Sequence, residues 1–250
     1  MCSTMNASLT RYSPGALCRM DDDMVNSCRT PAGSFRMTVS CAGVILIGTA
    51  AYGFAFGIWR CPLQGFYAAA KMPLLFFAIA FSSGLANYLL GLVMGARLVF
   101  GHVLMSMLYG MAVTAAILGA VSPVALFLVL QAPAPAPDIV GLPFRDPKVA
   151  ESMRVFWVIL LLHVGAIGAA GIAGNLKLLG LLRSLCGSRR MAARVLTVWI
   201  IVCGFVGCEL SWLFSPFLCK PNYPPHLIAR MYFDGNFYEH VWWGLKELRK

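Results

Sequence analysis

Four polar residues lie inside or beside strongly apolar stretches of this sequence, and their chemistry could matter most. They are Glu209, His163, Asn87 and Lys71. A charge in the hydrocarbon of a membrane costs about 3 kcal/mol or more, so an acid or base there needs a partner or a function. If all four side chains face inward, we expect them to form one intramembrane polar cluster.

The depth of Glu209 decides what it could do. If its apolar run stops at Phe214, the carboxyl group lies little more than one turn from the surface, where water or a cation can stabilise it. If the helix continues to Cys219, the carboxyl group lies near the midplane, where it is protonated or needs a polar partner. The candidate partners are Lys71, Arg60 and Lys220 in the first case, and His163 and Asn87 in the second. A structural hydrogen bond or salt bridge and an ion or proton pathway both remain open.

The other three polar residues also have structural interpretations. Asparagine readily bridges helices through hydrogen bonds, and a histidine among small residues is usually a packing residue. Lys71 lies near the end of the segment 60–73, which also contains apolar side chains, Arg60 and two prolines. This composition favours a short helix at the membrane boundary, although a ligand role for Lys71 remains open.

The composition predicts a protein with several membrane spans. Of the 250 residues, 59% are hydrophobic and 12% charged, whereas a soluble domain is about half apolar and about a quarter charged. The net charge of +10 comes from scattered basic residues, which does not indicate nucleic-acid binding. The nine cysteines form no CxxC pair, so no metal site is predicted. Without a recognisable catalytic motif, we expect no enzyme activity and no cofactor.

Five apolar runs are long enough to cross a bilayer, which takes about 20 residues. They cover 37–59, 72–96, 103–130, 156–176 and 195–214. The predicted fold class is therefore all-α: a polytopic membrane helix bundle with five transmembrane helices plus short interfacial helices.

Three regions follow from these runs. Residues 1–36 are polar and predict a disordered tail, and residues 37–219 form the transmembrane domain. Residues 220–250 form a C-terminal tail. Asn236 can cap an amphipathic helix there, which is suited to the membrane surface or to a partner protein.

The loop at 183–194 carries Arg183, Arg189, Arg190 and Arg194 without any acid. Short basic loops stay in the cytoplasm, so we expect this loop and the N-terminus to be cytoplasmic. Five spans then place the C-terminus outside, although its tail is also basic. The expected location is the bacterial cytoplasmic (inner) membrane.

Small residues recur every four positions in several runs, which places them on one side of each helix. The clearest examples are Gly53 and Gly57 in the first run and Gly91 and Gly95 in the second. Because membrane helices associate through close packing at small residues, we expect these glycines to face inward.

Two local motifs carry a resemblance to a known family. The stretch GFYAAAKMPL at 65–74 looks like the entry to the second span of some bacterial multi-span proteins. The stretch at 209–221 and GNFYE at 235–239 look like the C-terminus of such proteins. With five closely spaced spans after a polar tail, the chain resembles the Yip (Ypt-interacting) family. This resemblance implies a non-enzymatic integral membrane protein. The Asp-Leu-Tyr-Gly-Pro motif of eukaryotic members does not occur at 30–37.

The sequence therefore favours a scaffold or organiser that acts through helix packing and through protein or lipid contacts. Its expected partners are the lipid bilayer and other membrane proteins or a second copy. The alternative is a small-solute or ion transporter that uses Glu209 with His163 or Asn87. Matched breaks at Ser122-Pro123 and Ser215-Pro216 favour that alternative weakly.

Overall fold

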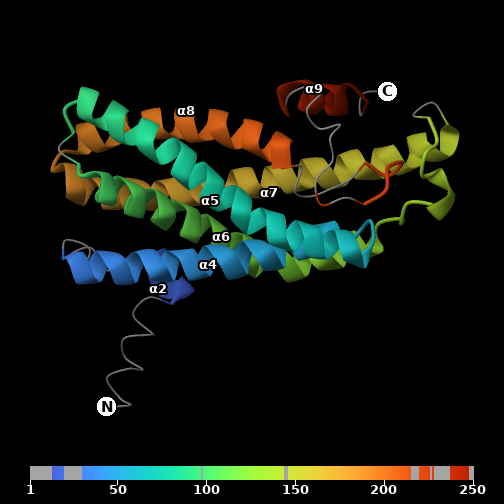
Figure 1. The fold of residues 1–250 in the computed structure, drawn as a ribbon, viewed down its shortest axis with the longest axis horizontal. Coiled ribbons are helices and arrows are strands. Elements are labelled where there is room, and N and C mark those ends of the chain that lie inside the picture. The colour runs from blue at the N-terminus through green and yellow to red at the C-terminus, as the bar shows by residue number, and fades with distance from the viewer. Residues whose placement is uncertain are drawn as a thin grey trace, which may run out of the picture.

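Long helices that run side by side make up most of the protein (Figure 1). The computed structural model describes residues 13–19, 30–96, 98–143, 146–214, 220–225, 227 and 237–247. The elements in these ranges are α2 (Pro14–Arg19), α4 (Pro31–Gly57), α5 (Pro62–Val93), α6 (Phe100–Gln131), the 3-10 helix η1 (Pro137–Ile139), α7 (Pro147–Cys186), α8 (Arg189–Phe214) and α9 (Phe237–Glu247).

The helices α4, α5, α6, α7 and α8 are each long and apolar enough to cross a membrane. The predicted all-α bundle with five candidate spans is therefore confirmed. Successive helices run in opposite directions, so the bundle has two ends (Figure 1). We call the end with Pro31, residues 94–96 and Gly187 the N-side, and the end with Gly57, Pro147 and residues 220–225 the C-side.

The parallel helices α4 and α6 form the most closely packed pair. An added Cβ at Gly48 would overlap the backbone carbonyl of Ala115, and one at Gly119 would lie 2.9 Å from Gly48 Cα. Near the two ends, Ser34 Oγ donates to Met105 Sδ over 3.4 Å and Trp59 Nε1 donates to the Pro133 carbonyl over 3.0 Å. In contrast, α7 and α8 contact each other much less.

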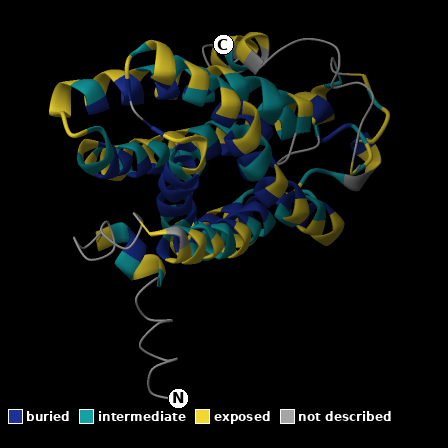
Figure 2. Ribbon diagram, turned by 60° about the vertical axis from the view of Figure 1, so that its left-hand side comes forward, coloured by how far each residue is buried: buried dark blue, intermediate teal, exposed yellow. Residues whose placement is uncertain are grey.

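Buried residues face the interior of the bundle, and exposed ones follow its outer faces (Figure 2). Many of the exposed residues are large and apolar, including Ile47, Val93 and Leu176. A long apolar outer face is what the hydrocarbon of a bilayer requires of a spanning helix.

The N-terminal region contains more structure than the expected disordered tail. The first long helix begins at Pro31, six residues before the predicted start, and Thr30 Oγ1 caps it by accepting from Gly33 N over 3.2 Å. Helix α2 packs against α6, with Leu17 fully buried and its carbonyl accepting from Tyr109 Oη over 2.9 Å. Apart from 13–19, residues 1–29 lie outside the described part of the chain.

The predicted interfacial segment at 60–73 is instead largely the start of α5. Helix α5 begins at Pro62, with Pro73 inside it. Proline suits the first helical position because its missing N–H needs no partner there. Similarly, α6 continues through the predicted break at Ser122-Pro123, and Ser122 Oγ donates to the Gly119 carbonyl over 2.7 Å.

Three chain segments meet at the C-side. Arg60 Nη2 donates to the Tyr223 carbonyl over 2.9 Å, and Gly141 N donates to the Asn222 carbonyl over 2.9 Å. Asn222 Nδ2 in turn donates to the Leu142 carbonyl over 3.2 Å. These bonds fix residues 220–225 against the ends of the spans. The predicted continuation of the fifth span to Cys219 and the cap at Asn236 lie outside the described residues.

Candidate cavity between α7 and α8

A partly enclosed cavity of about 500 Å³ lies between α5, α6, α7 and α8. Its walls on α7 run from Phe156 to Leu178 and its walls on α8 from Trp199 to Trp212, and most of the lining is apolar. The α8 wall rises about 20 Å at 1.5 Å per residue. A volume of this size with an apolar lining is typical of a small-molecule site.

Glycines on the facing sides of α7 and α8 create this space. Gly168, Gly171 and Gly204 line the cavity, and a Cβ added at any of them would meet no atom within 4 Å. Gly168 and Gly204 are exposed, so the cavity opens toward the outside of the bundle. Towards the N-side, Leu178 and Trp199 belong to one buried cluster, which closes that end.

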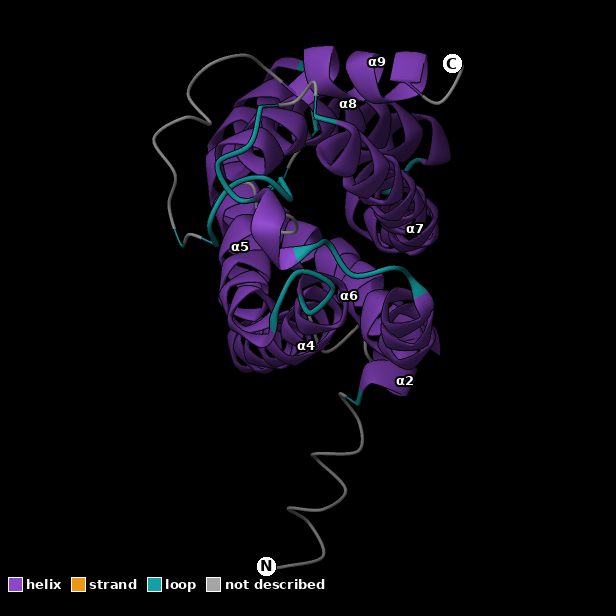
Figure 3. Cartoon of the chain, turned by 90° about the vertical axis from the view of Figure 1, so that its right-hand side faces the viewer, coloured by secondary structure: helices purple, strands orange, loops and turns teal. Residues whose placement is uncertain are grey.

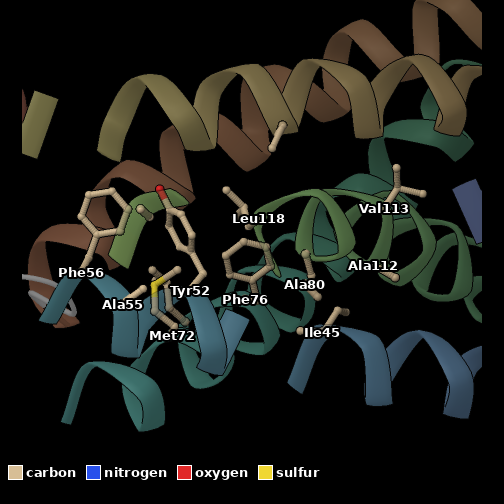
Figure 4. Close-up of a cluster of buried hydrophobic side chains, with 14 of the residues drawn as sticks. Ile45, Tyr52, Ala55, Phe56, Met72, Phe76, Ala80, Ala112, Val113 and Leu118 are labelled. Carbon is tan, nitrogen blue, oxygen red and sulfur yellow. The ribbon is translucent and has the colours of Figure 1, made fainter. Parts of the chain in front are cut away.

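His163 forms a polar part of the cavity wall. Its side chain is 1% exposed, and Nδ1 lies 3.0 Å from Tyr52 Oη on α4. The His163 ring also stacks on Tyr52, with centroids 5.2 Å apart, and contacts Phe56 at 4.8 Å. In Figure 4 the Tyr52 ring lies between Phe56 and Phe76, with its hydroxyl group pointing away from Met72. The pair joins α4 to α7 and fixes the histidine ring.

Other polar side chains on the lining bond to their own helices. Thr114 Oγ1 donates to the Gly110 carbonyl over 3.0 Å, and Asn175 Nδ2 donates to the Gly171 carbonyl over 2.8 Å. A donor that bonds to its own backbone needs no ligand partner. These residues therefore leave the cavity surface mainly apolar.

The C-side end of the cavity has a different character. The lining residues at this end are Trp157 of α7, Trp212 of α8, Lys220 and, from α9, Val241. Helix α9 lies outside α8 (Figure 3). In α9, Lys246 Nζ lies 5.2 Å from the ring centroid of Trp242. Tryptophan and lysine together are typical of the headgroup level of a membrane.

Asn87 binds helices together beside the cavity. It is fully buried, Nδ2 donates to Cys203 Sγ over 3.3 Å, and its backbone carbonyl accepts from Trp199 Nε1 over 3.1 Å. Nδ2 also lies 3.6 Å from Met107 Sδ on α6. Asn87 therefore holds α8 against α5, and its side chain is not among those that line the cavity.

Lys71 lies far from Asn87 along the same helix. It is 7% exposed and separated from Asn87 by sixteen residues of α5, which corresponds to about 24 Å at 1.5 Å per residue. The expected single polar cluster of Glu209, His163, Asn87 and Lys71 is therefore wrong. Sixteen residues along one continuous helix keep two of its members at different depths.

Glu209 is partly exposed and does not line the cavity. Its neighbours in α8 that do line the cavity are Gly207, Cys208 and Ser211. It lies on the side of α8 that faces α9. There, desolvation together with the Cys208 thiol and the Glu209 carboxyl group raises the pKa of Tyr238 above its usual value. Glu209 is thus close to α9 and outside the cavity lining.

The four glycines predicted to pack helices divide into two pairs. A Cβ at Gly53 would lie 2.6 Å from the Ala68 carbonyl oxygen, and one at Gly57 would lie 2.8 Å from the Gln64 carbonyl oxygen. At Gly91 and Gly95 an added Cβ would meet nothing within 4 Å. Gly95 follows the end of α5 with a φ of +80°, so it serves a turn and not a helix contact.

Among the described residues, no group of three His, Cys, Asp or Glu side chains lies close enough to hold a metal ion. The arginines of the predicted basic loop, Arg183, Arg189, Arg190 and Arg194, are exposed around the turn at Gly187. They form a charged N-side surface well away from the cavity.

The fold and the cavity define a class of protein: an all-α membrane helix bundle with a lateral apolar cavity. No family model, curated protein or solved structure matches the chain. The resemblance to the Yip family therefore stays a prediction.

Sequence reasoning did not find the Tyr52–His163 pair, the Trp199–Asn87 bond or the cavity. Tyr52 and His163 are 111 residues apart in the chain, so no local pattern links them. The only available signal was a tyrosine within the first apolar run, whose hydroxyl group needs a partner when buried.

Proposed function

We propose that this protein is a non-enzymatic membrane scaffold or organiser that holds a lipid molecule in the cavity between α7 and α8. The observation that carries the proposal is the row of open glycines, Gly168, Gly171 and Gly204, on an apolar wall that faces outward. In a bilayer, such an opening faces acyl chains. A bound lipid would fill the space between α7 and α8 and pack against both helices.

The closed ends of the cavity favour a lipid over the helix of a partner protein. A partner helix is about 10 Å wide and must cross the full hydrocarbon thickness of about 30 Å. The cluster that contains Leu178 and Trp199 blocks the N-side end, and Lys220 and Val241 stand at the C-side end. A single acyl chain needs no such continuous seam.

The transporter hypothesis has less support. It needs Glu209 to work with His163 or Asn87, yet Glu209 is not part of the lining and Asn87 bonds to sulfur and backbone partners. Reconstituted protein with and without Glu209→Gln would test it. Proton or cation flux that depends on Glu209 would favour the transporter and count against the scaffold.

The scaffold proposal is tested by filling the cavity. Gly168→Leu places a side chain in open space on the lining, and Gly165→Leu places the same side chain at an equally open position that is not on the lining. We expect native mass spectrometry to show bound lipid on the wild type and on Gly165→Leu, and its loss from Gly168→Leu. Equal lipid occupancy in all three proteins would overturn the proposal.

A further inference from the structure

Lys220 is the only charged residue among the described residues that line the cavity. Lys220 belongs to the C-side part of the lining, which also includes Trp157, Trp212 and Val241. The rest of the lining is mostly apolar. A ligand that fits has a long apolar body and a negative charge at one end.

The polypeptide around Lys220 holds this end of the cavity in place. Arg60 Nη2 and Gly141 N donate to the carbonyl groups of Tyr223 and Asn222 over 2.9 Å each. These bonds tie residues 220–225 to the ends of the spans. These bonds place the backbone from which the Lys220 side chain extends, where residues 220–225 and the ends of the spans meet.

The depth of Lys220 matches a lipid headgroup. Trp157, Trp212 and Trp242 lie at the same end of the molecule, and tryptophan gathers at the membrane–water interface. A chain that enters between Gly168 and Gly204 would run along the interior wall while its headgroup stays at this level. A phospholipid of the C-side leaflet could place its acyl chain along the cavity wall and its headgroup at the level of Lys220 at the same time.

From this arrangement we infer that the cavity between α7 and α8 selects an anionic phospholipid, with its acyl chain along Gly168, Gly171 and Gly204 and its phosphate group at Lys220. The inference rests on the proposed lipid-binding function and adds the headgroup class and the leaflet. A juxtamembrane cation contributes about 1 kcal/mol toward an anionic headgroup, which corresponds to about fivefold in affinity.

Native mass spectrometry of detergent-purified full-length protein can measure this preference. The probes are phosphatidylglycerol and phosphatidylcholine with the same acyl chains. We expect the wild type to prefer phosphatidylglycerol by about fivefold and Lys220→Gln to lose that preference. Arg154→Gln is the matched control, because Arg154 is an exposed cation of α7 that does not line the cavity, and it should keep the preference.

Three results would overturn the inference. The first is equal binding of both lipids by the wild type, and the second is an unchanged preference in Lys220→Gln. The third is full competition by glycerol phosphate, which would assign the charge recognition to a free phosphate group without a chain. In each case lipid loss from Gly168→Leu would still support the proposed function, so the two failures are distinguishable. A thermal melt of each variant establishes that it is folded.

Discussion

The close approach of α4 and α5 at Gly53 allows a quantitative test with a matched control. A Cβ at Gly53 would lie 2.6 Å from the Ala68 carbonyl oxygen and 2.7 Å from Met72 Cγ. The methionine side chain can move, but the Ala68 backbone belongs to α5 and cannot move without the helix. A Cβ at Gly43, in the same helix, would meet no atom within 4 Å.

The substitutions Gly53→Ala and Gly43→Ala share one term in their effect on the free energy of unfolding. Each replaces a helical glycine by alanine, and this replacement stabilises a helix by about 0.5–1 kcal/mol. Gly53→Ala alone also overpacks a tight contact, at a cost of about 1–3 kcal/mol. We therefore expect Gly43→Ala to be neutral or slightly stabilising and Gly53→Ala to be less stable than Gly43→Ala by about 2 kcal/mol.

Reversible unfolding in mixed micelles with increasing dodecyl sulfate, followed by tryptophan fluorescence, would measure both variants. The comparison between the two variants cancels the helix-propensity term and isolates the interhelical contact. If Gly53→Ala were as stable as Gly43→Ala within about 0.5 kcal/mol, then α5 must shift at little cost. The close approach of α4 and α5 at Gly53 would then contribute little to the stability of the bundle.

Three further outcomes follow from the structure. Tyr52→Phe removes the hydrogen bond to the buried Nδ1 of His163, so the same unfolding measurement should show a loss of about 1–3 kcal/mol, and a stability equal to wild type would refute this role. Single-cysteine proteins that keep only Cys186 or only Cys61, which lie at opposite ends of the bundle, should react with an impermeant maleimide from opposite sides of the membrane, with Cys186 on the cytoplasmic side. The hydrogen bond from a lysine lowers the pKa of the exposed Asp138 carboxyl group, so its small stabilising contribution is present above its unfolded pKa of about 3.9 and is lost as the pH falls through the folded pKa. Asp138→Asn should then lower the melting temperature more at pH 7 than at pH 2, and an equal effect at both pH values would contradict the assignment.

Hydropathy alone predicts the five spans because a run of about 20 apolar residues has few alternatives to crossing a bilayer. It predicts their ends poorly. Helix α7 extends from Pro147 to Cys186, whereas the apolar run covers only 156–176. A helix can continue beyond the hydrocarbon when its ends are capped. At the start of α7, Asp146 provides such a cap by accepting a hydrogen bond from Lys148 N over 2.9 Å.

The burial of Lys71 could not be predicted from its surroundings in the sequence. A cation between Pro62 and Pro73 indicates a connector, because proline usually interrupts helices and lysine favours water. In the structure Pro62 occupies a first-turn position that tolerates proline, and Pro73 lies inside the continuous helix. The packing of α5 against its neighbours, which is a tertiary effect, overrides the local signal.

The small-residue pattern predicts that a helix face is flat but not what lies against that face. Gly53 of α4 and Gly168 of α7 belong to similar stripes, yet one would clash with a neighbouring backbone and the other faces open space. The difference lies in the partner helix, whose position depends on contacts made elsewhere. The spacing of small residues along a helix therefore does not show where a cavity lies.

The anchoring of α8 explains why this cavity persists. Trp199 Nε1 and Cys203 Sγ both bond to Asn87 of α5, so α8 is held against α5 by directed bonds on one of its sides. Its contact with α7 includes the N-side cluster that contains Leu178 and Leu182. Moving α8 toward α7 to close the cavity would break the bonds to a fully buried asparagine, and an unpaired buried polar group costs about 1–3 kcal/mol. The bonds from Asn87 Nδ2 to Cys203 and from Trp199 to the Asn87 carbonyl therefore hold α8 on α5 and help to keep the cavity open.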